Sequence, residues 1–309
     1  FGLNSAATGP YSFAAGVDAA AVGISAVAIG NNAAANGNYS VAFGVGSRAN
    51  GAYGTTFGRN TIADGDYSTA LGYGARAFGP QGLAAGFNTT AGASAAGFGY
   101  QSSASGFASL AAGFQAAAGG GESVALGSNV RTGAGGSVVL GTNAWAQTEA
   151  TGTFLFGDRS TASDLLGTAV NQFRVRAAGG TFFYSNAAMT SGVVLISGGG
   201  GWSNLSDVNM KTDFRDLDGE HLLGRLAAMP VREWRYTTQD AAIRHVGPTA
   251  QDFRAAFGLG ESDVRISTVD TDGIALAAVK ALEARTREAN ERLTRENDDL
   301  RARLARLEA

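Results

Sequence analysis

Residues 37–58 read GNYSVAFGVGSRANGAYGTTFG, and this stretch sets the pattern for the first half of the chain. Glycine recurs every seven residues from Gly9 to Gly86 and, after a one-residue deletion, from Gly92 to Gly141, with Ala134 as the one exception. Because glycine alone enters positive-φ conformations without steric cost, this spacing indicates a turn that recurs every seven residues. Between the turns, runs such as residues 40–44 alternate in side-chain character, which is typical of short strands.

The full period is fourteen residues, because the residue before each glycine alternates between two kinds. It is mostly apolar in one register, as at Phe43 and Phe57, and mostly polar in the other, as at Asn36 and Asn50. We therefore expect a parallel β-solenoid with two strands per coil and an interior of Ala and Ser. About ten coils at a strand spacing of roughly 4.8 Å would make a rod on the order of 50 Å long.

A tube filled with alanine buries little apolar surface, which is poor support for so many ordered residues. We therefore expect the outer stripe that includes Phe43 and Phe57 to pack against the same stripe on two other subunits around a threefold axis. Other repeat folds fit less well. Collagen needs glycine at every third residue, and calcium-binding β-rolls need an aspartate in each turn. A disordered tract would not keep its apolar residues in register.

The alternating S-x-A-x-G and x-A-x-G patterns cover about residues 5–146 and closely resemble the heads of YadA-like trimeric autotransporter adhesins. The resemblance implies a trimeric left-handed parallel β-roll.

Composition divides the chain near residue 200. Residues 1–200 carry 7 Arg, no Lys and 7 Asp or Glu, whereas residues 201–309 carry 16 Lys or Arg and 19 Asp or Glu. The net charge of -3 argues against nonspecific electrostatic binding to nucleic acid. No apolar run is long enough to span a bilayer, and the absence of cysteine excludes disulfides and thiolate metal sites. Because the sequence begins at Phe1, we expect that its natural N-terminus is missing.

Residues 150–205 lose the glycine spacing and are expected to form a β-rich neck and a glycine-rich linker. The segments at residues 154–156, 173–176, 181–184 and 193–196 have the composition of strands. Arg174 and Arg176 suit either an acidic ligand or a structural role, and the structural role is favoured.

Residues 198–211, GGGGWSNLSDVNMK, place the hydroxyl of Ser206 five residues before the amine of Lys211. Such a pair suits a self-cutting site, but a linker serine and a surface lysine can also stand there without a role. Asp207 can orient Lys211 or a water, or it can cap a helix, and Asn209 flanks the same pair. Residues 198–201 can supply either flexibility or backbone donors for an oxyanion.

The run LSDVNMK, residues 245–253 (HVGPTAQDF) and residues 270–282 (DTDGIALAAVKAL) occur in one order after Trp202. Together they resemble the endosialidase-type intramolecular chaperone of phage tail spikes, tail fibres and some bacterial surface proteins. The resemblance implies a domain that assists trimeric folding and then cleaves itself once between Leu205 and Ser206, as a serine endopeptidase with a Ser206–Lys211 dyad. Ser206 Oγ reaches the preceding carbonyl through a five-membered ring. Lys211 must be neutral to take the proton, so we expect its pocket to form only after assembly.

A helix is expected from about Gly273 to the end of the chain. Its 4-3 seam of Leu, Val, Thr and Asn predicts a coiled coil in which Asn290 and Asn297 fix register and strand number. The pattern Asp270-x-Asp272-Gly273 lacks the rest of a calcium loop and is better explained as a turn capping that helix. His221, on a helix at residues 219–229, and His245 are expected to be structural. No cofactor and no metal are predicted.

The sequence thus predicts a mainly β chain with an α-helical C-terminus. It comprises a β-roll head (1–149), a neck and linker (150–205), a small α+β chaperone and autoprotease domain (206–272) and a coiled coil (273–309). The predicted product is a homotrimeric fibre on a virion or a bacterial surface that binds a cell-surface receptor or glycan. The alternative is a spacer that carries a missing N-terminal module and keeps its C-terminal domain as a non-cleaving trimerisation cap.

Overall fold

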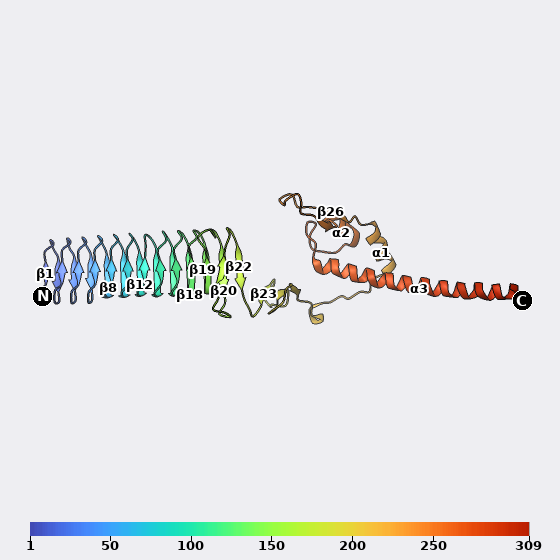
Figure 1. Cartoon of the computed structure of the whole chain (residues 1–309), viewed down its shortest axis with the longest axis horizontal. Helices are drawn as coiled ribbons and strands as arrows, with labels where there is room; N and C mark the ends of the chain where they lie inside the picture. Colours follow the sequence, from blue (N-terminus) through green and yellow to red (C-terminus); the bar gives the residue numbers. More distant parts are fainter. Residues whose placement is uncertain (309) are drawn as a thin grey trace. The chain divides into compact units, whose positions relative to one another are not determined.

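The computed structural model describes residues 1–308, which fall into two compact units. The first unit contains Phe1–Phe182 and Val194–Trp202, and the second contains Phe183–Val193 and the chain from Ser203 onward. The first unit is a β-solenoid of about 11 turns, and the second ends in a long helix (Figure 1).

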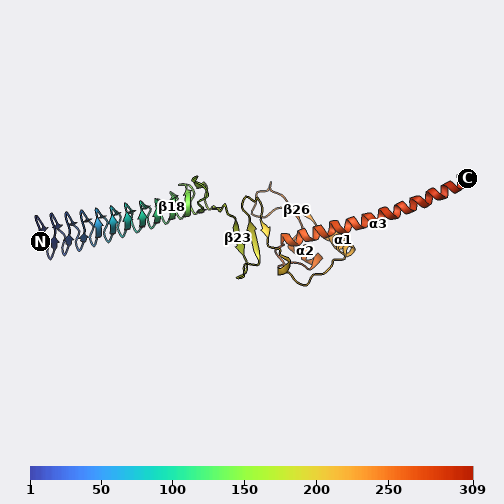
Figure 2. The ribbon, with the colours of Figure 1, turned by 90° about the horizontal axis from the view of Figure 1, so that it is seen from below.

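Each solenoid coil has one longer and one shorter strand, and each strand pairs in parallel with its equivalent in the next coil. Figure 2 shows the same coils from a perpendicular direction, stacked one after another. The longer strands are β2 Phe13–Ala15, β4 Val27–Ile29, β6 Val41–Phe43, β8 Thr55–Arg59, β10 Thr69–Tyr73, β12 Leu83–Phe87, β14 Ala96–Tyr100 and β16 Leu110–Phe114. The shorter strands are β1 Ala6–Ala7, β3 Ala20–Ala21, β5 Ala34–Ala35, β7 Arg48–Ala49, β9 Ile62–Ala63, β11 Arg76–Ala77, β13 Thr90–Ala91, β15 Ser103–Ala104 and β17 Ala117–Ala118.

The register confirms the predicted period. Phe43 lies opposite Phe57, fourteen residues on. Gly86 lies opposite Gly99, so the one-residue deletion shortens a single coil to thirteen residues. The missing residue is the one before Gly92. In the preceding coil the N–H groups of Phe78 and Gly79 both donate to the carbonyl of Ala91, whereas after the deletion Gly92 itself takes the first of these two places and donates to the carbonyl of Ala104 at 2.8 Å.

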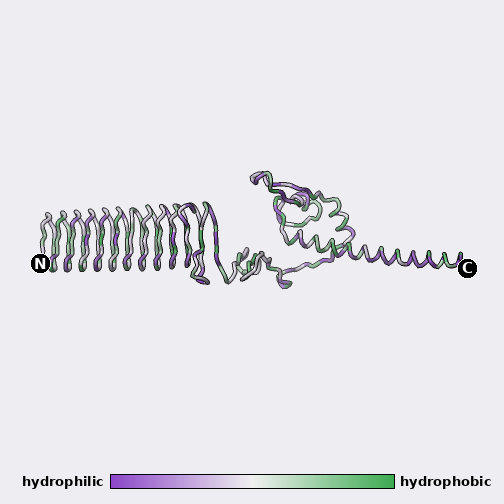
Figure 3. Tube along the Cα trace, in the orientation of Figure 1, coloured by the Kyte–Doolittle hydropathy of each residue, from purple (hydrophilic) through white to green (hydrophobic). Residues whose placement is uncertain are grey.

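The interior of the solenoid is a column of buried alanines and serines, as predicted, and it also contains buried threonines. Several serine hydroxyls bond within the coil; Ser68 Oγ, for example, donates to the carbonyl of Gly65 at 2.6 Å. The buried hydroxyls of Ser40, Thr56, Thr61 and Thr89 have no hydrogen-bond partner in the single chain. The aromatic residues that precede the turn glycines lie outside, where Phe43 and Phe57 stack with parallel rings 4.7 Å apart. Figure 3 shows hydrophobic and hydrophilic residues mixed along every coil.

The recurrent glycines serve two purposes, and only the first of them, a turn with positive φ, was expected from the sequence. Glycines of the longer strands have positive φ, as at Gly58 (+139°). Glycines of the other register, such as Gly51, do not have positive φ. They are required because an added Cβ at Gly51 would lie 2.1 Å from the carbonyl oxygen of Gly65 in the next coil. The left-handed corner position there belongs to other residues, such as Tyr53 (φ 57°) and Tyr67 (φ 58°).

The solenoid continues past residue 149, where the sequence analysis placed its end. Strands β18 Val124–Thr132 and β19 Val138–Ala146 run through a corner, and β20 Phe154–Gly157, β21 Leu165–Gly167 and β22 Phe173–Arg176 complete the sheet. The glycine spacing is lost because the connecting loops lengthen, while Leu155 still fills the interior. A separate three-stranded sheet follows, formed by β23 Thr181–Tyr184, β24 Gly192–Leu195 and β25 Ser203–Asn204. The strand segments predicted at residues 154–156, 173–176, 181–184 and 193–196 are confirmed to within one residue.

The second unit contains the helical elements. They are the 3-10 helix η1 Val208–Met210 and the helices α1 Gly219–Ala228, α2 Ala250–Phe257 and α3 Thr268–Glu308, with an antiparallel pair β26 Arg232–Trp234 and β27 His245–Gly247. A small core joins the three α-helices and consists of Leu222, Leu223, Phe253, Ile274 and Ala278.

Helix α3 begins five residues before the expected Gly273, so the capping turn predicted at Asp270 to Gly273 is wrong. Ser267 accepts a hydrogen bond from the N–H of Val269 and starts the helix, and Asp270 lies in its first turn, where a carboxylate suits the helix dipole. Among the described residues, no helix combines the length and the apolar character needed to cross a membrane.

Candidate functional site

The segment around Ser206 leaves a strand and enters a single helical turn. Strand β25 ends at Asn204, and the N–H of Leu205 donates to the carbonyl of Gly192 at 3.1 Å. Asp207 then caps η1, accepting hydrogen bonds from the backbone N–H and the side-chain amide of Asn209 at 2.9 and 3.0 Å. Of the two roles weighed for Asp207, the structure shows the helix cap, and Asn209 supports it.

This turn returns Lys211 to Ser206. The N–H of Lys211 bonds to the carbonyl of Val208, and the side-chain Nζ of Lys211 donates to Ser206 Oγ at 2.5 Å. A serine hydroxyl and a lysine amine in direct contact are the parts of a nucleophile and its base. The hydroxyl of Ser206 is also covalently tethered to the carbonyl of Leu205, the group that it would attack. Bringing the two groups together therefore costs little entropy.

Both side chains of the pair are exposed in the single chain. Large apolar side chains nearby in the sequence are exposed as well, among them Val208, Met210, Phe214 and Leu217. Residues 198–201, the other segment weighed for this site, form a turn after β24 in which the N–H of Gly199 bonds to the carbonyl of Ile196.

Helix α1 is tied to α3 by a two-fold ion pair that the sequence analysis missed. Arg285 Nε and Nη2 lie 2.9 and 2.5 Å from the two carboxylate oxygens of Glu220. This hydrogen bonding lowers the pKa of Glu220 and raises that of Arg285. Helix α1 itself starts at the cap Asp218, whose side chain accepts from the N–H of His221. The helix expected at residues 219–229 is therefore confirmed to within one residue.

His245 has a structural setting, as expected. Its ring centroid lies 4.9 Å from that of Trp234, and its Nε2 lies 2.8 Å from Gln239 Oε1. Thr249, two residues after β27, caps α2 by accepting from the N–H of Asp252. The motif at residues 245–253 therefore builds a strand and the start of a helix. Within residues 1–308, no group of three or more His, Asp or Glu side chains is placed to hold a metal ion.

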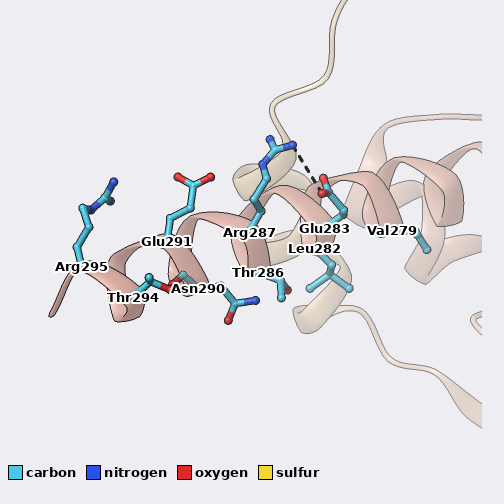
Figure 4. Close-up of a pocket in the computed structure, with 9 residues that line it drawn as sticks. All are labelled: Val279, Leu282, Glu283, Thr286, Arg287, Asn290, Glu291, Thr294 and Arg295. Carbon is cyan, nitrogen blue, oxygen red and sulfur yellow. Dashed lines mark hydrogen bonds and ion pairs between the residues drawn. The ribbon is translucent and has the colours of Figure 1, made fainter. Parts of the chain in front are cut away.

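The outer face of α3 is a long uncharged stripe. Figure 4 shows Leu282, Thr286 and Asn290 on one side of the helix, with Glu283 and Arg287 on the other. The 4-3 spacing of the predicted seam would place a seam residue at Glu283, between Val279 and Thr286, and Leu282 takes that place instead. Seam residues are exposed in the single chain, including Leu276 at 73% and Val279 at 65%, whereas Ile274 and Ala278 face the small core.

The fold and the site define a class of protein: a repetitive fibre followed by a small helical domain with a candidate cleavage site. Residues 7–89 and 104–129 match the family model described as the YadA head domain repeat. Residues 206–258 match a peptidase family described as the chaperone of endosialidase. The chain therefore carries YadA head repeats followed by an endosialidase-type chaperone domain.

The comparison with solved structures found the crystal structure of the collagen-binding domain of the Yersinia adhesin YadA. It is 21% identical to this chain with a TM-score of 0.33, and the match covers 55% of this chain and 76% of that one. No curated protein matches the chain.

Proposed function

We propose that the chain is a subunit of a homotrimeric surface fibre or adhesin whose C-terminal domain promotes assembly and then removes itself. The observation that carries this proposal is the order of the parts: YadA head repeats, then the chaperone domain with Lys211 Nζ at 2.5 Å from Ser206 Oγ.

Exposed apolar surface supports the trimer. Phe43 and Phe57 stack on the outside of the solenoid, 40% and 57% exposed, and the alanine interior supplies little apolar burial of its own. The seam of α3 repeats every three and four residues without a partner in the single chain, which is the pattern of a coiled coil. Three parallel chains would cover both surfaces.

Self-cleavage would proceed through an ester. Lys211 accepts the hydroxyl proton as Ser206 Oγ attacks the carbonyl carbon of Leu205, and the Leu205–Ser206 C–N bond breaks as its nitrogen takes up a proton and becomes the amine of Ser206. Water then attacks the ester and releases the carboxylate of Leu205 and the hydroxyl of Ser206. The exposed apolar residues near the pair in the sequence support the idea that assembly excludes water from the site. Burial there would favour the uncharged amine of Lys211, because burial disfavours a charged amine.

The test is the intact mass of freshly expressed protein. We expect two products, residues 1–205 and 206–309, from the parent chain, and a single uncut chain from Ser206→Ala and Lys211→Ala. Ser203→Ala and Lys280→Ala are matched controls, because Ser203 lies three residues from the site and Lys280 is the other lysine of the chain. Cleavage in Ser206→Ala would exclude the mechanism, and an uncut parent would leave the domain as a permanent trimerisation cap.

The adhesive role has its own test. We expect fluorescently labelled trimer to bind cells at the surface through a receptor or a glycan. A trimer that binds no cell type would instead be a spacer, and its function would lie in another module of the fibre. Phage and bacterial origin differ in where the fibre is found, so immunogold labelling of virions and of cells separates the two.

A further inference from the structure

The last coils of the solenoid contain an inserted loop. Between β16 and β17, two residues join the longer strand to the shorter one, whereas residues 158–164 join β20 to β21. The register shows the same insertion. Gly141 pairs with Gly157, 16 residues on, whereas Ala144 pairs with Leu165, 21 residues on, so five extra residues lie between the two strands. Insertions in a solenoid extend outward as loops without disturbing the stack, and such loops are common places for binding sites.

The inserted loop is held rigidly by Arg176. The guanidinium donates to Asp158 Oδ1 at 2.9 Å, to the carbonyl of Ser163 at 2.7 Å and to the carbonyl of Thr142 at 3.2 Å. Asp158 also accepts from Ser160 Oγ and from the N–H of Ala178, both at 2.6 Å. These hydrogen bonds, led by the one from Ser160, hold the pKa of Asp158 well below its usual range.

The loop forms one wall of a pocket of about 460 Å³ at the corner of the solenoid. The other wall is made by amide side chains that occupy equivalent corner positions of successive coils. All of these corner residues have the left-handed backbone conformation that recurs at the turns. The pocket is lined by Gln115, Asn129, Arg131, Asn143, Ala162 and Asp164.

Two interactions fix the geometry of the lining. Asn143 donates its amide to the carbonyl of Thr161 at 2.9 Å, which joins the corner to the loop. Arg131 forms an ion pair with Asp164, and its guanidinium lies over the ring of Trp145 at 4.8 Å from the centroid. The charged groups therefore face each other, so the lining carries no net charge.

We propose that this pocket binds an uncharged hexose residue of a cell-surface glycan. The side-chain nitrogens of Gln115, Asn129 and Asn143 each donate once within the protein, to Gln101, Asn143 and Thr161. Each keeps a second N–H for a ligand and the amide oxygens can still accept, which suits vicinal hydroxyl groups that donate and accept together. An anionic ligand would have to displace Asp164 from Arg131, whereas a neutral polyhydroxyl ligand can bond to both without losing the pair. The volume lies in the range of small-ligand sites. This inference rests on the proposed adhesive function and locates the binding site in this pocket.

The test is saturation-transfer NMR on the full chain with glucose, galactose, mannose and N-acetylglucosamine, and with N-acetylneuraminic acid as the anionic comparison. We expect saturation transfer to at least one of the four uncharged sugars. We expect Asn129→Ala to weaken that binding at least about tenfold, the effect of losing one or two hydrogen bonds. Asn88→Ala is the matched control, because Asn88 occupies the same left-handed corner position but does not line the pocket.

Circular dichroism establishes that both variants fold as the parent does. No transfer to any of the four sugars would overturn the proposal, as would equal binding by Asn129→Ala and Asn88→Ala, or a stronger response from the anionic sugar. Cell adhesion separates the two hypotheses: a parent that adheres, with an Asn129→Ala variant that adheres equally, retains the adhesive function and removes this pocket from it. A parent that binds a hexose but adheres to no cell removes the adhesive function instead.

Discussion

The Nζ of Lys211 lies 2.5 Å from the Oγ of Ser206, on a part of the single chain where water reaches both side chains. Only an uncharged lysine can accept a proton, and burial favours the uncharged form. The geometry of the pair is thus present in one chain, and in the proposed mechanism other chains supply the dry surroundings. In that mechanism, cleavage would occur only in assembled chains.

We therefore expect Leu300→Asp, in the seam of α3, to abolish the trimer and to slow cleavage together. Three buried carboxylates would face one another at this layer of the coiled coil. Light scattering gives the oligomeric state, and intact mass gives the cleaved fraction. Ala302→Asp adds the same charge outside the seam and should leave both unchanged. A monomeric Leu300→Asp chain that cleaves at the parent rate would contradict the coupling.

Gly58→Ala should destabilise the solenoid by at least about 3 kcal/mol, from backbone strain and overpacking together. The backbone of Gly58 has φ +139°, and an added Cβ would lie 1.9 Å from the carbonyl oxygen of Gly72. Gly121→Ala is the control, since its added Cβ would meet nothing closer than 3.7 Å. Thermal unfolding followed by β-sheet circular dichroism should show a midpoint lowered by roughly 6–12 °C for the first variant only. Equal midpoints would show that the coils can separate at little cost.

Arg176→Met should release the loop at residues 158–164, because the side chain bonds to both ends of that loop. Trypsin should then cut after Arg159 at least about tenfold faster, since proteolysis follows local opening. Arg174→Met is the matched control on the same strand and removes one tryptic site in the same way. The mass of the fragments identifies the cut. Equal rates in the two variants would assign the order of the loop to other contacts.

Acid should weaken the attachment of α1 to α3. Because hydrogen bonding from Arg285 lowers the pKa of Glu220, the folded state keeps this carboxylate ionised to a lower pH than the unfolded chain does. The stabilising effect is fully present above the unfolded pKa of about 4.3 and is lost as the pH falls through the lower folded value. The free energy of unfolding of the helical domain, measured between pH 6 and pH 2, should therefore fall less steeply with decreasing pH in Glu220→Gln than in the parent. Parallel declines would show that other carboxylates set the acid response.

The regular part of the fold could be read from the sequence because each coil repeats one environment. Glycine spacing gave the turns, and the alternation around Ala42 and Phe43 gave the inner and outer faces. The end of the solenoid could not be read in this way. Leu155 keeps the interior position after the glycine spacing has gone, because longer loops interrupt the repeat without ending the stack.

At the candidate site, the sequence predicted which residues belong together but not how the chain brings them there. The spacing of Ser206 and Lys211 suggested a pair, while the helical turn that joins them depends on the cap at Asp207. The partners of Arg176 lie up to 34 residues away, so no local pattern indicates its role in ordering the loop. The start of α3 at Thr268 was missed because a hydroxyl cap at Ser267 lies before the acidic residues that suggested a turn.

The register of the solenoid has a consequence for how such genes change. A coil meets its neighbours through the same pairing on both sides, as Phe43 does with Phe57, so duplication or loss of fourteen residues leaves every remaining turn with an equivalent neighbour. Each such event alters the reach of the molecule by one strand spacing, roughly 4.8 Å. Under the proposed adhesive function, in-frame recombination between repeats would adjust the distance between a cell or particle and its target in small heritable steps, without altering the residues that bind the target.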